Sequence, residues 1–338
     1  MAVYAGQGDA RRSMSLLWRA ERPEQPRRTP GPGPRPGLSV DAIVTAAIAV
    51  ADEEGMAALS MRAVGERLGR TAMALYTYVP GKGELLDLMY DAVHAELSGE
   101  YGEFEGYGEH GTRGACGTHR ACGARGGSGE SGRHERCGAA HGERSDAGDW
   151  RAGLTAWARD MLEFHLRHPW VLQISQARPV LGPHEYAALD TLVRLLNGTG
   201  LEAGPVRRLV GTLTHFVRGC AGTVAEARQA AAVTGESDEE WWFTRSTLLS
   251  EVAPDFADRY PSLSAMERDS APQPPPAVDE DEDTRRGEGK EGGNEGDEEA
   301  MPFLEREARK TFALGLGVLL DGIEAAIRRT DAPRDRAG

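Results

Sequence analysis

The sequence lacks the features that mark membrane proteins and the common enzyme classes. No apolar run approaches the roughly 20 residues that a transmembrane helix needs, and the run at 312–320 is short and ends at Asp321. There is no Gly-x-Ser-x-Gly elbow, no Gly-x4-Gly-Lys phosphate loop, no His-Glu-x2-His pair and no dinucleotide fingerprint after a strand. We therefore expect no membrane partner, no cofactor and no enzyme.

Cysteine is also scarce, with four residues in 338, and we see no leader sequence. This combination predicts a cytoplasmic protein without disulfides. The formal net charge of −14 argues against strong general affinity for nucleic acid. The length allows about two domains, and composition separates folded from low-complexity parts of the chain.

What the chain does contain is a helix-turn-helix pattern over residues 60–82. Ser60 can cap a first short helix, and Gly69 supplies the left-handed residue that a sharp turn requires. The inward side chains of this helix are Met61, Val64 and Leu68. The pattern predicts two helices that meet at a tight angle.

The second helix of the pair begins at Thr71, whose hydroxyl can cap it. Leu75 and Val79 turn inward at i, i+4 spacing. The side chains left outward are Ala72, Met73, Thr77 and Tyr78. Small and polar tips of this kind suit a helix that reads a DNA groove.

Amphipathic helices are expected on both sides of the pair. Residues 40–54 form one that Gly55 closes, with its apolar face on Ile43, Ala47, Val50 and Ala51. Residues 82–97 form the other, with its apolar face on Leu85, Leu86, Met89 and Val93. The sequence thus predicts a three-helix domain followed by a connecting helix.

These residues resemble the tetracycline-repressor-like regulators over 38–97. The resemblance rests on Glu-Glu-Gly at 53–55, Leu-Ser-Met-Arg at 59–62, Leu75-Tyr76 and Lys82. It implies that Tyr76 and Lys82 hold DNA phosphates, with Arg62 a third candidate for a backbone contact. It also implies that base edges or nearby phosphates are faced by Arg70, Thr71, Ala72, Met73, Thr77 and Tyr78.

Charge limits the expected DNA affinity. Residues 39–97 hold four basic and nine acidic side chains, a balance of −5. No acid lies between Arg67 and Lys82, so with Arg70 this stretch carries +3, and the amino end of the helix at Thr71 adds partial positive charge. We expect weak non-specific binding with a modest salt dependence.

The first 37 residues hold seven arginines, three acids and six prolines without a sustained hydrophobic period. We expect them to form a disordered basic arm. Such an arm can follow the DNA backbone or enter a minor groove. The alternative, slightly favoured, is a reading frame that begins too far upstream, with Met14 as another start.

Residues 98–148 form a Gly-rich insert that we also expect to be disordered. It contains the soft and imidazole ligands Cys116, His119, Cys122, His134, Cys137 and His141. Their number would suffice for tetrahedral zinc, but their spacing is irregular. Because such a composition produces near-matches on its own, a linker is favoured over a metal site.

Residues 149–263 and 301–330 read as a second, helical domain. Helices are expected over 150–167, 184–196, 205–232, 237–252 and 303–329. Between them, 264–300 includes a Pro-Pro-Pro run and an acidic block at 279–299 with eleven acids and three basic residues, a balance of −8. We expect a solvated loop, favoured over an acidic mimic of DNA.

The second domain resembles the effector domain of the tetracycline-repressor subgroup more loosely. The carrying residues are Ala-Arg-Pro at 177–179, Gly-Leu at 200–201 and Thr-His-Phe-Val-Arg-Gly-Cys at 214–220. The resemblance implies that 205–232 and 303–329 form a four-helix dimer interface with a second copy. The histidine that ligates the drug's magnesium in that subgroup is Ile174 here, which argues against tetracycline-magnesium recognition.

An effector pocket is expected between the helices of the second domain, apolar with a few polar tips. Its candidate lining is Trp157, Met161, His165, Trp170, Gln173, His215 and Phe216. For each of these, plain core packing is the alternative.

The sequence as a whole predicts an all-α, homodimeric regulator. It would bind a palindromic operator in double-stranded DNA as a repressor and be released by an unknown small-molecule effector. The alternatives are a metal-responsive regulator that uses the Cys/His insert and, less favoured, a helical enzyme.

Overall fold

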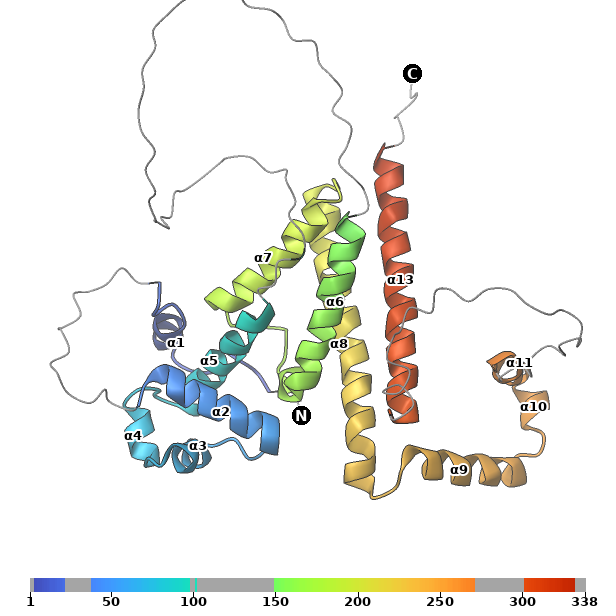
Figure 1. Ribbon diagram of the computed structural model, residues 1–338, viewed down its shortest axis with the longest axis horizontal. Helices are drawn as coiled ribbons and strands as arrows, with labels where there is room; N and C mark the ends of the chain where they lie inside the picture. The colour runs from blue at the N-terminus through green and yellow to red at the C-terminus, as the bar shows by residue number, and fades with distance from the viewer. Residues whose placement is uncertain (1–2, 22–37, 98–100, 102–148, 271–300, 332–338) are drawn as a thin grey trace, which may run out of the picture.

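The protein is helical throughout the part that the structure describes. The computed structural model describes residues 3–21, 38–97, 101, 149–270 and 301–331, and every regular element in these ranges is a helix (Figure 1). The predicted all-α fold is confirmed. No helix in the described ranges combines the length and the apolar character that crossing a bilayer requires.

The helices fall into an amino-terminal group and a longer carboxy-terminal group (Figure 1). The first group is α1 (Ala10–Leu17), α2 (Val40–Glu54), α3 (Met61–Leu68), α4 (Ala72–Tyr76), α5 (Lys82–His94) and the 3-10 turn η1 (Ala95–Leu97). The second group is α6 (Asp149–Arg167), η2 (Pro169–Gln173), α7 (Pro183–Asn197), α8 (Ala203–Thr234), α9 (Asp238–Val252), α10 (Phe256–Arg259), α11 (Pro261–Ser270) and α13 (Phe303–Asp331).

Local chemistry sets the ends of the short helices. The Ser60 hydroxyl accepts from the Ala63 amide at 3.1 Å, and the Thr71 hydroxyl accepts from the Ala74 amide at 3.4 Å. Gly69 ends α3 in the left-handed region at φ 63°, where a Cβ would be strained. Gly65 allows α3 to pack closely against the turn at Arg70, because a Cβ on Gly65 would lie 2.7 Å from the Arg70 carbonyl oxygen.

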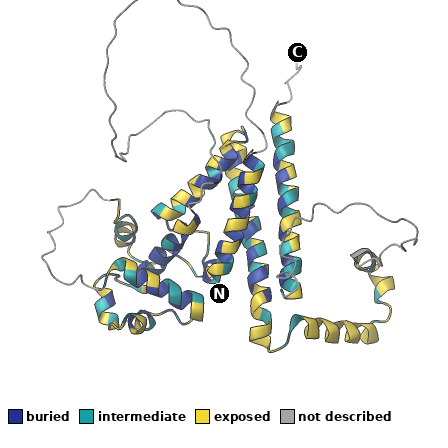
Figure 2. Ribbon diagram, in the orientation of Figure 1, coloured by how far each residue is buried: buried dark blue, intermediate teal, exposed yellow. Residues whose placement is uncertain are grey.

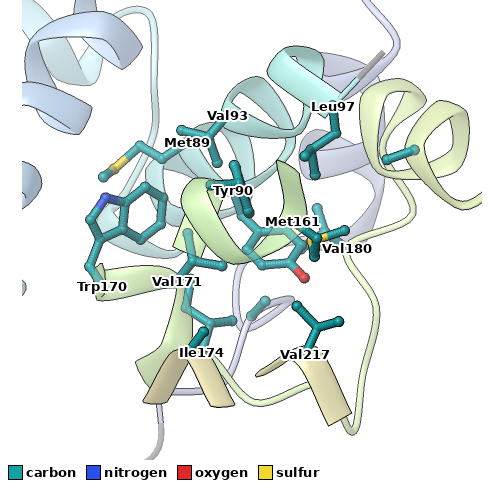
Figure 3. Packing of buried hydrophobic residues seen from close by; sticks show 14 of the residues in the cluster. Met89, Tyr90, Val93, Leu97, Met161, Trp170, Val171, Ile174, Val180 and Val217 are labelled. Atoms are coloured by element: carbon teal, nitrogen blue, oxygen red, sulfur yellow. The ribbon is translucent and has the colours of Figure 1, made fainter. Parts of the chain in front are cut away.

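Helix α5 joins the two groups because nearly all of its faces are covered. Every residue from Glu84 to Asp91 is buried. The Tyr90 side chain reaches from α5 toward Met161 and Val180 of the second group (Figure 3). One continuous apolar cluster therefore runs from α2 through α5 into the bundle of α6, α7 and α8.

The expectation that residues 1–37 lack structure is wrong for residues 3–21. Helix α1 is capped by Asp9, whose carboxylate accepts from the Arg12 amide at 2.8 Å, and it packs on α5 with Leu17 4% exposed. Packing against α5 orders a segment whose own sequence shows no long hydrophobic period. The expectation of a loop over 264–300 is likewise wrong for 264–270, because α11 runs to Ser270, and 271–300 lies outside the described residues.

Helix α9 stands apart from the bundle, and its aromatic residues do not join the core. None of its residues is buried, and Phe243 is 76% exposed (Figure 2). A capping box formed by Ser237 and Glu240 stabilises its start locally. The helix thus forms without a core beneath it among the described residues.

Candidate functional site

The predicted recognition helix lies at the surface. Leu75 and Val79 are fully buried, while Thr71, Tyr76 and Thr77 are exposed. Met73 is also exposed, at 75%. Ala72 and Tyr78 are half-buried against the domain. The helix therefore presents a short face of mixed chemistry, anchored by two apolar side chains on its opposite side.

The basic residues around this helix differ in how free they are. The Arg67 guanidinium forms a two-pronged ion pair with Glu53, with one N–O distance of 2.7 Å, and Arg62 pairs with Glu66 at 2.8 Å. Arg70 is exposed and has no ion-pair partner among the described residues. The net positive charge of this face is thus smaller than the +3 counted from sequence, because Glu53 offsets Arg67.

Lys82 is exposed at the first turn of α5. Its ammonium donates to the Leu59 carbonyl at 2.7 Å, which fixes the side chain against α3 and still leaves two N–H donors. Gly81 caps α5 without a side-chain hydrogen bond, so the first amides of this 13-residue helix keep their partial positive charge. The pairing of a lysine with a helix amino end is an arrangement that binds phosphate.

A second site lies in the bundle, where α5, α6, α7 and α8, together with the segment 174–180, line an open cavity of about 280 Å³. Four of the predicted effector residues line it: Trp157, Met161, His165 and His215. Trp157 and His165 are almost fully buried, at 2% and 3% exposed. The cavity is small, largely apolar and built from more than one helix, as effector pockets generally are.

Three other predicted effector residues do not line this cavity. Trp170 is buried at the domain junction, where its indole N–H donates to Asp52 at 2.7 Å. Gln173 is exposed. Phe216 stacks on Phe312 with ring centroids 5.8 Å apart, so it joins α8 to α13.

Two buried histidines in the cavity wall, His94 and His165, are neutral at pH 7. Burial lowers the pKa of His94 to about 4 and that of His165 to about 3. His94 Nδ1 lies 2.6 Å from the Tyr90 carbonyl oxygen, which only accepts, so Nδ1 carries the proton and Nε2 is left as an acceptor. The buried His165 Nδ1 has no hydrogen-bond partner among the described residues.

Two charged side chains near the cavity, Arg218 and Glu185, form hydrogen bonds with backbone atoms. The Arg218 guanidinium donates to the Val171 carbonyl of η2 and to the Ile174 carbonyl just after η2, the latter at 2.8 Å. Glu185 accepts from the Leu181 amide at 2.6 Å, and desolvation raises the pKa of its carboxyl group. The buried part of the cavity wall therefore offers neutral polar atoms, while the charged Arg178 lines the cavity at an exposed position.

Sequence reasoning missed part of the cavity wall, notably Ala5, Tyr90 and His94. Tyr90 and His94 lie on α5, whose apolar period only showed which side chains turn inward. Their aromatic and polar side chains on an otherwise apolar helix were the signal that could have identified them as cavity residues. Ala5 carried no signal, because its position depends on tertiary packing of the amino-terminal segment.

The Cys/His insert lies outside the described residues. Within the described ranges, no group of three or more histidine, cysteine or acidic side chains is placed to hold a metal ion. Cys220 is half-buried there and forms no disulfide. The zinc alternative therefore stays a hypothesis about residues 116–141.

Comparisons with protein families match both groups of helices. The model for "Bacterial regulatory proteins, tetR family" matches residues 43–89, and that for "Tetracyclin repressor-like, C-terminal domain" matches residues 144–282. A curated relative, the HTH-type transcriptional repressor DrrR1 of Streptomyces coeruleorubidus, is 32% identical over 268 residues. That alignment covers 79% of this chain and 80% of the relative.

Solved structures show the same architecture. Apo ActR from Streptomyces coelicolor matches with a TM-score of 0.52 at 18% identity, covering 87% of this chain and 98% of that one. ActR in complex with actinorhodin matches with a TM-score of 0.51 at 20% identity, covering 86% and 96%. At these identities the likeness establishes the shared fold.

Proposed function

This chain belongs to the TetR family of bacterial regulatory proteins, and from that premise we propose that it is a homodimeric transcriptional repressor which a small-molecule effector releases from its operator. The observation that carries the proposal is the exposed helix α4, held by buried Leu75 and lying beside Lys82 of α5. Helix α5 also lines the cavity, so one helix contacts both sites. The protein acts by binding, in the cytoplasm where its DNA target lies, and we propose no catalytic activity.

The DNA-binding part of the proposal assigns two kinds of contact. Lys82, Tyr76 and Arg62 would position the protein on phosphates. Residues on and beside α4 would contact base edges or the phosphates near them: Arg70, Thr71, Ala72, Met73, Thr77 and Tyr78. Few free cations surround this face, so specificity would come from fit in the groove more than from bulk charge.

The effector part of the proposal concerns the cavity bounded by Trp157, Met161, His165 and His215. Because His94 and His165 are neutral and the neighbouring Arg218 donates to backbone carbonyls, the buried part of the cavity suits an uncharged, mainly apolar molecule. The free acceptor on His94 Nε2 would receive a hydroxyl or N–H from that molecule. Ile174 is buried at the cavity wall in place of the family's magnesium ligand, so the proposed effector needs no metal.

The dimer part of the proposal concerns the outer faces of α8 and α13, which lie side by side (Figure 1). Leu314 and Val318 are 73% and 62% exposed on α13. Glycines 219, 222, 317 and 322 leave open space where a Cβ would stand, which allows a second helix pair to approach closely. Two copies joined here would present recognition helices to half-sites about 34 Å apart.

Selection from randomised duplex DNA tests the function. The purified full-length protein should enrich a palindrome, and the enriched duplex should compete away from the protein far better than a scrambled one. Failure to enrich any sequence, with the protein shown to be folded by circular dichroism, would overturn the proposal. Mass spectrometry of the same sample for bound zinc tests the metal-responsive alternative, which requires that zinc be present.

A further inference from the structure

The amino-terminal segment at residues 3–19 touches both the effector cavity and the DNA-binding helices. It lies outside the two ranges, 43–89 and 144–282, that the family models match. We propose that this segment, here called the strap, is a wall of the effector site and couples its occupancy to the position of α5. The inference rests on the proposed function and adds a residue-level route for regulation.

At the cavity end, the strap pairs with the backbone that follows η2. The Val3 amide donates to the Gln173 carbonyl at 2.9 Å, and the Val3 carbonyl accepts from the Ser175 amide at 2.7 Å. These two bonds form a parallel bridge to Ile174. Ala5, next along, is 2% exposed and lines the cavity with Ile174 and Ser175. A ligand in the cavity therefore contacts the strap directly.

At the other end, the strap binds the first two turns of α5. The Gly6 amide donates to the Asp87 carboxylate at 2.8 Å, and the Asp9 amide donates to the Glu84 carboxylate at 3.0 Å. Both carboxylates are buried, at 1% and 7% exposed. Glu84 is two residues from Lys82 on the proposed DNA face, so these bonds hold the helix that carries the phosphate contact.

The close approach of strap and helix depends on glycine. A Cβ on Gly8 would collide with the Glu84 carboxylate, and a Cβ on Gly83 would lie 3.1 Å from the Gly8 amide nitrogen. Gly8 is therefore the point where strap and α5 are in tightest contact. A larger residue there would separate them without entering the cavity, because Gly8 does not line it.

Helix α1 fixes the far end of the strap on both domains. The Trp18 indole N–H donates to the Leu181 carbonyl at 3.0 Å, beside the start of α7, and Arg19 forms an ion pair with Asp41 on α2. The strap thus contacts four parts of the fold: the backbone after η2, helix α5, the start of α7 and helix α2. A ligand that prefers one position of the strap would shift α5 by its differential affinity, and operator DNA would change ligand affinity by the same factor.

Hydrogen exchange on the full-length protein tests this coupling without a known effector. In free protein, Gly8→Val should speed exchange in the peptide containing Ser175 at least tenfold, although Ser175 lies at the cavity and Gly8 at α5. Gln7→Ala, which changes an exposed neighbour in the same segment, should leave that peptide within twofold of wild type. An unchanged Ser175 peptide in Gly8→Val would overturn the proposal.

A second arm adds the operator duplex obtained by selection. In wild type, DNA should slow exchange at least fivefold in residues 3–9 and 173–176, and in Gly8→Val the slowing at 173–176 should disappear while the peptide spanning 82–90 stays protected. If wild type binds the operator and 173–176 does not respond, the coupling is wrong and the regulator function stands. If no duplex binds, the proposed function is wrong, and the exchange measured in free protein still tests the role of the strap. Deleting residues 2–8 gives a second variant should Gly8→Val fail to fold.

Discussion

His168 Nδ1 lies 2.8 Å from Asp52 Oδ1, and this contact joins the effector domain to the second half of α2. Asp52 Oδ1 also accepts from the Trp170 indole N–H at 2.7 Å. His168 Nε2 lies 3.1 Å from Glu96 of η1. A nearly buried imidazole therefore bridges two carboxylates from the amino-terminal helices, so the orientation of the DNA-binding helices depends on it.

Replacing Asp52 should weaken this junction. In Asp52→Ala the buried Trp170 N–H and His168 Nδ1 lose their acceptor, and an unsatisfied buried donor costs about 1–3 kcal/mol. We expect the free energy of unfolding in urea to fall by about 2 kcal/mol. Glu54→Ala, an exposed acid on the same helix, is the control and should change it by less than about 0.5 kcal/mol. Equal effects in the two variants would show that the junction bonds contribute nothing.

Acid should destabilise the protein through the two buried cavity histidines. Their folded-state pKa values, about 4 for His94 and about 3 for His165, lie below the unfolded value of 6.5. The unfolded chain therefore binds more protons below pH 6.5, and stability present above that pH is lost as the pH falls toward 4. The loss approaches about 1.4 kcal/mol per pH unit for each histidine.

The variant His165→Leu isolates one of these two contributions. Urea unfolding measured at intervals between pH 7 and pH 5 should show a shallower decline than wild type, by roughly half of the histidine-dependent part. His215→Leu, at an exposed position on the cavity rim, is the matched control. A decline that His165→Leu leaves untouched would mean that His165 is not held neutral.

Lys82 should contribute charge to DNA binding and little sequence information. Lys82→Gln removes one phosphate contact per chain, so operator and random duplexes should weaken by similar factors. The slope of log K against log salt should fall by about 0.9 for each lost contact. Lys310→Gln removes a surface lysine on α13 and should leave the slope unchanged. Fluorescence anisotropy from 50 to 300 mM salt measures both.

Met73 should have the opposite signature. Its side chain is uncharged and 75% exposed on α4, so Met73→Ala should alter which bases are enriched in a selection and leave the salt slope as in wild type. The unfolding midpoint should also stay constant, because the side chain packs on little. An unchanged base preference would remove Met73 from the reading face.

Local signals made the helix-turn-helix predictable from sequence. Ser60, Gly69 and Thr71 each act within a few residues, through a cap or a left-handed backbone, and the structure places all three in those roles. The helix at 40–54 has the predicted bounds for the same reason: Ser39 caps its start and Gly55 ends it.

Features that depend on tertiary packing were not predictable in the same way. Nothing in residues 3–19 alone indicates that Ala5 lines a cavity or that Gly8 touches α5. The sequence placed Phe216 in the effector pocket and gave no sign that it stacks on Phe312 instead. The aromatic composition of 237–252 likewise does not indicate that none of the residues of α9 is buried in the described chain.

Binding to a whole and a half operator tests the central claim most directly, namely that two copies read two half-sites through α4. Anisotropy should give at least hundredfold weaker binding when one half of the selected palindrome is scrambled, and sedimentation should give two chains on the intact duplex. Leu314→Glu, on the open face of α13, should lose the intact-duplex advantage, whereas Val233→Glu, exposed near the end of α8, should keep it. One chain per duplex with equal affinity for whole and half sites would contradict the account.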